Sequence, residues 1–319
     1  MGSRENQNPA LRDLDSAYDP RSFEQVTLEA GSMELEVMRF GGRASQLRPL
    51  VVLHSLEYPI PPSAEFCRVV AERGFQVVFV RRPGFGRSSY LPEVLYSENL
   101  IEQGATCAAE AALIAAFISQ LELENCVLLA LATAAPLGCR IAALSPKISQ
   151  TILVNPRLNR ADWDDSRPGW FRDMLKQIIK HRSGIRIAEK GMKFLVRRDT
   201  LSFYKQFLKS SAADLDYFSE NQPDFASAKA ILLGVSSDVI FADTKISVET
   251  DRFLSGGCFD GLPVSVVGGA DSSDTWRAGL ASEAARVGAS FFEAPNGDLF
   301  CVYQNPGFLL DLIETEKVE

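Results

Sequence analysis

The sequence predicts an α/β protein built on a largely parallel, doubly wound sheet. Short, fully apolar runs recur along the chain, and two of them, at 50–53 and 75–80, flank a helix-like stretch. Such runs are typical of central parallel strands, because helices cover both faces of such a sheet. With 319 residues, 46% of them hydrophobic, the chain can bury a core of this size.

Strands and helices are expected to alternate along most of the chain. Residues 23–30 and 33–40 suit two strands of a starting hairpin. The elements expected next are strand 50–53, helix 63–73, strand 75–80, helix 105–121, strand 126–131, helix 134–144 and strand 151–154. After a helical interruption the pattern resumes with strand 263–267, helix 275–287, strand 290–292 and helix 306–314.

The expected domain organisation is one core interrupted by a basic insert. Residues 1–22 mix charge, Pro, Ser and Asn without an apolar period, which predicts a flexible arm. Residues 157–230 are interpreted as a helical lid between the core segments 23–156 and 231–319. Residues 157–209 hold 14 Lys and Arg against 6 Asp and Glu, a charge of +8, so the remainder of this chain of net charge −8 carries −16.

Composition narrows the functional classes. The net charge of −8 argues against a nucleic-acid binder. No apolar run reaches the roughly 18 residues that span a bilayer and the first residues do not resemble a signal peptide, so we expect a cytoplasmic protein. Six scattered cysteines without C-x-x-C spacing indicate buried thiols, and with only two histidines we expect neither a metal nor an organic cofactor.

Motifs in the first half of the chain resemble those of the α/β-hydrolase superfamily. Leu53-His54-Ser55 is similar to the family's His-Gly turn after the third strand, and residues 82–88 (RPGFGRS) are similar to the turn after the next strand. Residues 121–156 resemble the family's strand–elbow–helix–strand core. The glycines at 84 and 86 fit this turn better than a phosphate loop, which needs a third glycine.

The resemblance continues to the end of the chain and implies a fold. Residues 268–271 (GGAD) are similar to the loop that carries the family's acid, and residues 295–298 (PNGD) to the segment that carries its histidine. The family's fold is an about eight-stranded, mostly parallel sheet flanked by helices. A helical lid is inserted after the sixth strand. We expect this fold from residue 23 to residue 314.

The catalytic positions that the resemblance implies hold the wrong residues. In the family's G-x-S-x-G elbow a serine is exposed on a strained turn, but residues 130–134 read Ala-Leu-Ala-Thr-Ala, and Ala132 has no nucleophilic atom. Asp298 stands in place of the histidine, and a carboxylate is a poor base unless burial raises its pKa. Asp271 stands at the acid position with no histidine to orient. The sequence therefore argues against ordinary serine hydrolysis.

Neighbouring residues complete the expected site. Thr133 becomes the nucleophile only if the register shifts by one, which puts the upstream strand and Pro146 out of step. Ser55 replaces a glycine of the oxyanion turn, and His54 is expected to pack or hydrogen-bond within the fold, with ligand contact as the alternative. The candidate ligand-pocket residues are His54, Ser55, Leu131, Thr133 and Asp298.

Cations near the expected site are candidate ligands of an anion. Arg81 and Arg82 end a strand at the edge where such sheets bind ligands, and we favour a surface ion pair over an anion site. Residues 170–182 place cations opposite an apolar stripe, which suits a membrane surface or an acidic partner; we favour a stripe that covers the pocket. The other lid arginines that could line its mouth are Arg167, Arg186, Arg197 and Arg198.

The function favoured by the sequence is a pseudo-hydrolase that binds a small-molecule ligand or a protein partner. One alternative is a lyase, cyclase or isomerase in which Asp271 and Asp298 share protons. Another is a hydrolase that uses Thr133 or a carboxylate. A fourth reading is structural, with the acidic body and basic lid mediating oligomerisation. The sequence names no ligand and fixes no oligomeric state.

Overall fold

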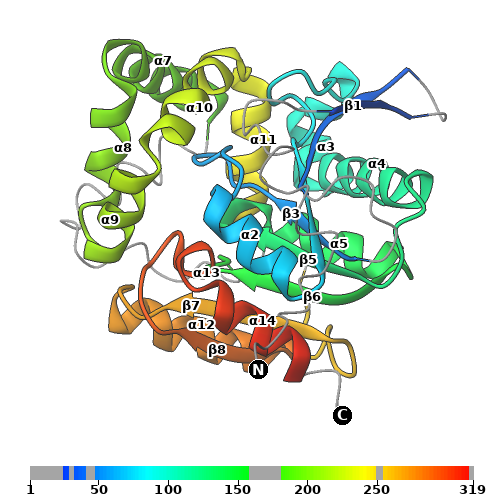
Figure 1. Cartoon of the computed structure of the whole chain (residues 1–319). Helices are drawn as coiled ribbons and strands as arrows, with labels where there is room; N and C mark the ends of the chain where they lie inside the picture. The colour runs from blue at the N-terminus through cyan, green and yellow to red at the C-terminus, as the bar shows by residue number, and fades with distance from the viewer. Residues whose placement is uncertain (1–23, 29–31, 41–46, 158–180, 249–253, 316–319) are drawn as a thin grey trace, which may run out of the picture.

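The computed structural model describes residues 24–28, 32–40, 47–157, 181–248 and 254–315 (Figure 1). Its sheet has the strand order β1-β2-β4-β3-β5-β6-β7-β8. The strands are β1 (Glu24–Thr27), β2 (Glu34–Arg39), β3 (Arg48–Leu53), β4 (Phe75–Val80), β5 (Cys126–Leu131), β6 (Ile148–Val154), β7 (Val264–Gly269) and β8 (Ser290–Ala294). β2 pairs antiparallel with β1 and β4, and the remaining pairs are parallel, which confirms the predicted sheet.

Two sets of core residues alternate along the strands, because successive side chains point to opposite faces of a sheet. Val51 and Leu53 belong to the core that α4, α5 and α12 cover, whereas Leu50 and Val52 belong to the core under α2 and α14. These helices are α2 (Ala64–Glu72), α4 (Ala105–Gln120), α5 (Ala135–Leu144), α12 (Asp274–Val287) and α14 (Pro306–Thr315). The predicted helices are thus present, within two residues of their expected ends. Shorter elements that were not predicted are η2 (Glu93–Tyr96), α3 (Glu98–Glu102), η3 (Ala132–Ala134) and α13 (Cys301–Gln304).

Between β6 and β7 the described chain is helical, and we call residues 182–248 the helical insert. Its helices are α7 (Arg182–Arg198), α8 (Thr200–Leu208), α9 (Ala212–Glu220), α10 (Gln222–Gly234) and α11 (Ser237–Val248). The boundary expected at residue 230 falls inside α10, since α11 continues the helical run and packs on the core beside η3. The apolar face predicted at 170–182 lies almost wholly outside the described residues, as does the arm at 1–22.

The turn after β4 is locked by its serine and its second glycine. Ser88 Oγ donates to the Arg81 carbonyl (2.8 Å) and accepts from the Glu36 amide (3.0 Å), which ties the turn to β2. Gly86 has a φ of +58°, and a Cβ there would collide with the Glu36 carboxylate. This turn fixes Arg81 and Arg82 below the helical insert.

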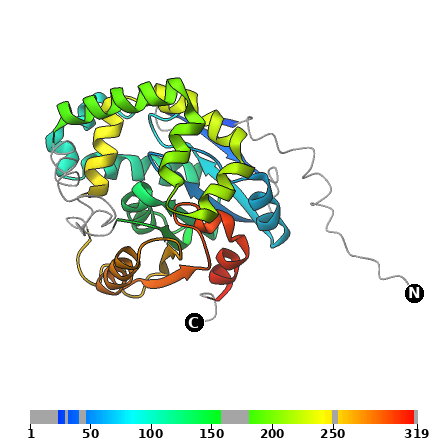
Figure 2. The same ribbon diagram turned by 90° about the vertical axis from the view of Figure 1, so that its left-hand side faces the viewer.

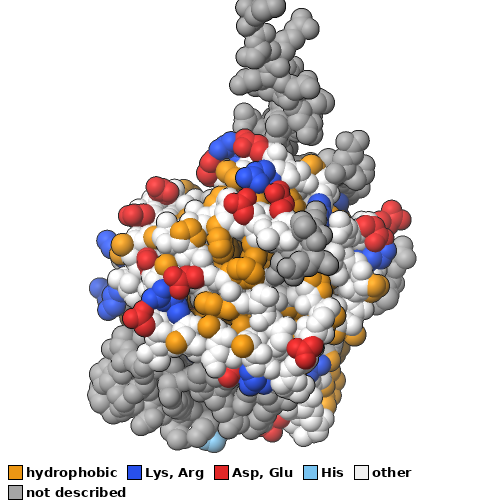
Figure 3. All heavy atoms as spheres, turned by 90° about the horizontal axis from the view of Figure 1, so that it is seen from below, with side chains coloured by type: hydrophobic (Ala, Val, Ile, Leu, Met, Phe, Trp, Pro, Cys, Tyr) orange, Lys and Arg blue, Asp and Glu red, His pale blue; other side chains and the backbone are white. Residues whose placement is uncertain are grey.

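The face seen from below carries mixed charge. Figure 3 shows hydrophobic side chains gathered there among Lys, Arg, Asp and Glu of both signs. In the described part of the chain no single helix is both long and apolar enough to cross a bilayer.

The cysteines are free, and five of the six are buried as expected, whereas Cys258 is half-buried. Cys258 lies within a turn rather than in a strand or helix, which explains its greater exposure. Burial raises the pKa of the Cys107 thiol to about 12, so this sulfur stays protonated at neutral pH.

Candidate functional site

The candidate site lies at the turn from β5 into α5, which we call the elbow (residues 130–134). Ala132 has a φ of +44°, the left-handed conformation that costs a residue with a Cβ roughly 1 kcal/mol. The strained geometry that exposes a nucleophile in a G-x-S-x-G turn is therefore present, although its side chain is a methyl group. Ala132 and Thr133 are half-buried and can be reached by a ligand.

Alanines fit the flanking positions of the elbow because space is made elsewhere. Ala130 and Ala134 are fully buried. Opposite Ala130 stands Gly138 of α5, where a Cβ would lie only 2.6 Å from the Ala130 Cβ. Gly138 therefore supplies the room that a glycine at 130 otherwise gives.

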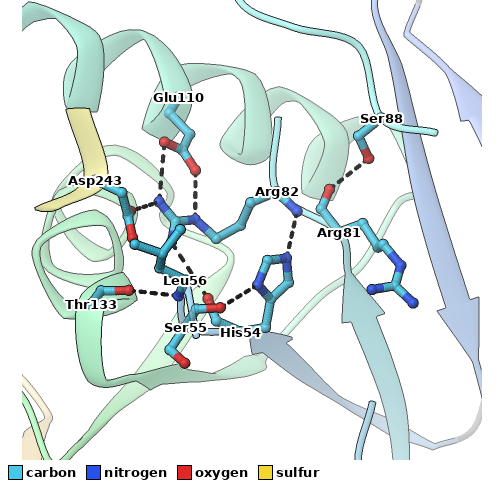
Figure 4. Close-up of polar contacts among 9 residues, drawn as sticks. All are labelled: His54, Ser55, Leu56, Arg81, Arg82, Ser88, Glu110, Thr133 and Asp243. Carbon is cyan, nitrogen blue, oxygen red and sulfur yellow. Dashed lines mark hydrogen bonds and ion pairs between the residues drawn. The ribbon is translucent and has the colours of Figure 1, made fainter. Parts of the chain in front are cut away.

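A hydroxyl of the elbow accepts a hydrogen bond from a backbone amide of the neighbouring loop. Thr133 Oγ1 accepts a hydrogen bond of 2.8 Å from the Leu56 N–H, which follows the His54-Ser55 turn after β3 (Figure 4). An amide of this loop and the amide after the nucleophile form the oxyanion hole in G-x-S-x-G enzymes. In this chain the Leu56 N–H, an amide of the corresponding loop, is already satisfied by a side chain of the protein.

Asp298 links neighbouring loops through its carboxylate and its backbone carbonyl. Its Oδ1 accepts a hydrogen bond from Ser272 Oγ, and its carbonyl accepts one from Asn155 Nδ2. Asn155 Nδ2 also approaches Asp298 Oδ1 at 3.4 Å. These contacts join the ends of β6 and β7 to the loop after β8, which is a structural role for the carboxylate.

Asp271 is bound to the helical insert. Its Oδ2 accepts a hydrogen bond of 2.6 Å from Ser211 Oγ, at the start of α9, and its side chain is exposed. Asp271 and Asp298 thus accept hydrogen bonds from two different serines, Ser211 and Ser272. This arrangement does not favour the alternative in which the two share a proton.

His54 is a structural histidine. It is fully buried, and its ring packs against Phe79 and Phe85. Nδ1 lies 2.8 Å from the Ser55 carbonyl and Nε2 accepts from the Arg82 N–H at 3.1 Å, so the neutral tautomer with a proton on Nδ1 satisfies both contacts.

Burial sorts the predicted ligand-pocket residues into two groups. His54, Ser55 and Leu131 are buried, and Ser55 Oγ accepts from the Tyr58 N–H at 3.2 Å within its own turn. Thr133 and Asp298 keep partial exposure. Of the five residues predicted to meet a ligand, only these two are accessible to one in the conformation described.

The buried state of His54 predicts a pH dependence of stability. Burial, followed by the charge of Arg82, holds the pKa of His54 well below its ordinary 6.5. The unfolded chain takes up a proton below pH 6.5 and the folded chain does not, so stability is lost as the pH falls below that value. Between pH 6.5 and pH 5 we expect a loss of about 2 kcal/mol from this residue.

Urea unfolding at several pH values measures this effect. The difference in the free energy of unfolding between the native chain and His54→Gln should shrink by that amount from pH 6.5 to pH 5. The control is His181→Gln, at the only other histidine, which is exposed; its free energy of unfolding should depend on pH as that of the native chain does. Parallel slopes for the native and His54→Gln proteins would contradict the neutral buried histidine.

Arg81 and Arg82 form buried ion pairs, so the predicted surface ion pair was wrong. Arg82 Nε lies 2.7 Å from Glu110 Oε1, and its guanidinium also contacts the Asp243 carboxylate (Figure 4). Arg81 pairs with Glu36 at 3.5 Å. α4 and α11 cover this end of β4, which the apolar strand alone could not reveal. Since Arg82 is only 4% exposed and already bound to two carboxylates, an anion-binding role is excluded for it.

Charges within the Arg82 cluster stabilise one another. Burial opposes the charge of Arg82, but the carboxylates of Asp243 and Glu110 outweigh it and raise the pKa of the guanidinium. Burial raises the pKa of Glu110, and Arg82 opposes this rise. Asp243 Oδ2 is buried and finds no hydrogen-bond partner among the described residues. The cluster joins β4, α4 and α11 directly behind the elbow.

Two accessible charges near the elbow were missed by the sequence reasoning. Glu57 follows Leu56, and its side chain is exposed, yet surrounding protein removes enough water to raise its pKa. The charge of Asp243 adds to this rise and that of Arg157 opposes it. Arg157, just after β6, is half-buried. Among the described residues no group of three or more His, Cys, Asp or Glu is placed to hold a metal ion.

Comparison with known proteins places the architecture. No family model and no curated protein matches the sequence. A putative epoxide hydrolase from Klebsiella pneumoniae is similar in structure, with a TM-score of 0.62 at 14% identity over 94% of this chain and 98% of the other. An esterase from Thermogutta terrifontis gives 0.60 at 16% identity over 93% and 98%, and one from Exiguobacterium antarcticum gives 0.58 at 15% over 92% and 99%.

This chain has the α/β-hydrolase fold. The predicted fold class is therefore confirmed, including helices inserted after the sixth strand. In an α/β-hydrolase the nucleophile follows the strand that is β5 here, which is where Ala132 lies. At identities this low the likeness shows the fold alone, so activity has to be argued from the site.

Proposed function

We propose that this protein is a pseudo-hydrolase that binds a small-molecule ligand or a protein partner over the elbow without cleaving it. The observation that carries the proposal is the hydrogen bond from the Leu56 N–H to Thr133 Oγ1. The Leu56 amide takes the place of an oxyanion-hole donor, and here it already donates to the side chain of the residue after Ala132. A hydrolase would keep this donor free for the oxyanion of its intermediate.

Nucleophile and base are missing in the same region. Ala132 holds the elbow conformation without a reactive atom, and the Asp298 carboxylate is bound to Ser272. Strain at a residue with a Cβ persists only where the surrounding structure imposes it, and such sites are commonly functional. The elbow keeps its strained turn, and Thr133 and Glu57 beside it are accessible. Without a nucleophile, these features support ligand binding rather than cleavage.

The alternative of a hydrolase with an unorthodox nucleophile has less support. The Thr133 oxygen accepts the Leu56 amide hydrogen, and within the described residues no base is bonded to its hydroxyl. A nucleophilic hydroxyl needs an adjacent base to take its proton.

A cytoplasmic location stays a prediction from the sequence.

A fluorophosphonate probe tests for an activated hydroxyl. Such probes phosphonylate an activated Ser or Thr oxygen and release fluoride, so intact mass spectrometry reports the adduct directly. We expect no adduct on the native chain and none on Thr133→Ala. An adduct on the native chain that Thr133→Ala abolishes would overturn the proposal, because it would identify Thr133 as a working nucleophile.

A further inference from the structure

The outward face of α7 carries large apolar side chains that are exposed to solvent. Ile187 is 72% exposed and Phe194 is 64% exposed. They stand seven residues apart, which is two helical turns, so they share one face of the helix. Ile185 and Val196, which are buried, mark the opposite face that packs on the protein. The helix therefore has an apolar inner side and a second, exposed apolar row.

A row of cations runs beside the exposed apolar row. Arg186, Lys190 and Arg197 follow one another at helical spacing, and all three are exposed. Within the described part of the chain these three side chains make no hydrogen bond or ion pair. The cations nearer the inner face are paired, Lys193 with Glu189 at 2.8 Å and Arg182 with Asp238 at 3.3 Å.

The acidic residue of α7 does not offset these cations. Glu189 is the only Asp or Glu of the helix, and its side chain is 14% exposed and paired. The outer face of α7 (Arg186, Ile187, Lys190, Phe194, Arg197 and Arg198) is thus purely cationic and apolar, on a chain with net charge −8. Figures 1 and 2 show α7 on the outside of the helical insert, away from the sheet.

We propose that the outer face of α7 docks the protein on an anionic lipid bilayer. A helix lying in the interface buries an apolar row below the headgroups and keeps its cations level with the lipid phosphates, which is the arrangement seen here. The basic side chains add electrostatic attraction to an anionic leaflet. The acidic remainder of the chain is repelled by the same leaflet, so it favours the orientation with α7 toward the lipid. This inference does not depend on the proposed function of the elbow.

Vesicle co-sedimentation tests the proposal on the full-length protein. We expect binding to phosphatidylcholine vesicles that contain phosphatidylglycerol, and weak binding to phosphatidylcholine alone. Changing Arg186, Lys190 and Arg197 to Gln should weaken binding on the order of 100-fold. Ile187→Ser with Phe194→Ser should weaken it on the order of 10-fold or more, because the apolar row is lost.

Matched controls separate this face from general charge and hydrophobicity. The charge control changes three cations on the surface of the α/β domain to Gln, namely Arg73, Arg87 and Lys147. The net charge falls by the same amount as in the α7 variant, so binding to the vesicles should change by less than about threefold. Leu144→Ser removes a side chain that is 55% exposed on α5 and should have no effect.

Several results would overturn docking on lipid. One is the absence of binding to anionic vesicles at low ionic strength, and another is equal loss in the charge control. A third is a dimer in light scattering that Ile187→Ser with Phe194→Ser dissociates, since this would assign the face to a second copy of the chain. Circular dichroism of each variant establishes that it is folded before binding is compared.

Discussion

Arg82→Met is expected to lower the free energy of unfolding by about 4 kcal/mol, because it leaves two buried carboxylates without their cation. Glu110 and Asp243 both contact the Arg82 guanidinium, and α4 and α11 bring them there from distant parts of the chain. Methionine fills much of the same volume, so the loss reports charge rather than a cavity. Urea unfolding of the native and variant proteins at neutral pH measures it.

Two further variants identify the cause. Adding Glu110→Gln and Asp243→Asn to Arg82→Met should restore part of the stability, since no unpaired charge stays buried. Arg87→Met, at an arginine 61% exposed and paired with Glu36, should cost less than about 1 kcal/mol. If the triple variant is less stable than Arg82→Met alone, uncompensated charge is not the reason for the loss.

Asp214→Ala is expected to lower the free energy of unfolding by about 3 kcal/mol, since several donors lose one shared acceptor. The Asp214 carboxylate accepts from the backbone N–H groups of Asp298 (3.2 Å) and Leu299 (2.9 Å), and from Gln304 Nε2 (2.6 Å). Asp214 lies on α9 and is 1% exposed. It therefore fastens the helical insert to the loop that carries Asp298.

Hydrogen exchange locates the effect of this variant. The amides of residues 298–300 should lose protection in Asp214→Ala more than the strands do, because the carboxylate is their acceptor. Asp216→Ala, at an exposed acid on the same helix, serves as the control and should leave both stability and protection unchanged. Uniform loss of protection over the whole chain would contradict a local fastening role.

The sheet was predictable from the sequence because its strands are buried on both faces. Runs such as 50–53 and 75–80 are apolar at every position except Gln76, so the side chains on both faces of the strand are apolar. This pattern is typical of a parallel strand whose two faces are covered by helices. The position of the elbow was also predictable, since Ala132 keeps the spacing of the family motif and has the strained φ that the motif requires. Hydrophobic periodicity thus predicts the sheet, whereas the resemblance to the α/β-hydrolase family predicts the position of the elbow.

The polar contacts behind the elbow were not predictable in the same way. Leu56 and Thr133 are 77 residues apart, and Arg82 and Asp243 are 161 apart, so only the packed fold brings them together. One local signal was available. Glu110 is the only charged residue in α4, and a lone acid in an apolar helix indicates a buried cation beside it. The surface ion pair expected for Arg81 and Arg82 was wrong because both are buried. Glu110 of α4 and Asp243 of α11 contact Arg82, whereas Arg81 contacts Glu36 of β2 and the Pro59 carbonyl.

Under the proposed function, the elbow of this α/β-hydrolase fold does not cleave esters. Turnover of short- and medium-chain p-nitrophenyl esters by the purified native protein, measured beside the variant Thr133→Ala with Asp298→Ala, tests it most directly. The account predicts that the native rate equals that of the double variant. A native rate that exceeds it and that the double variant loses would contradict the account, because a catalytic group would then be at work in the elbow.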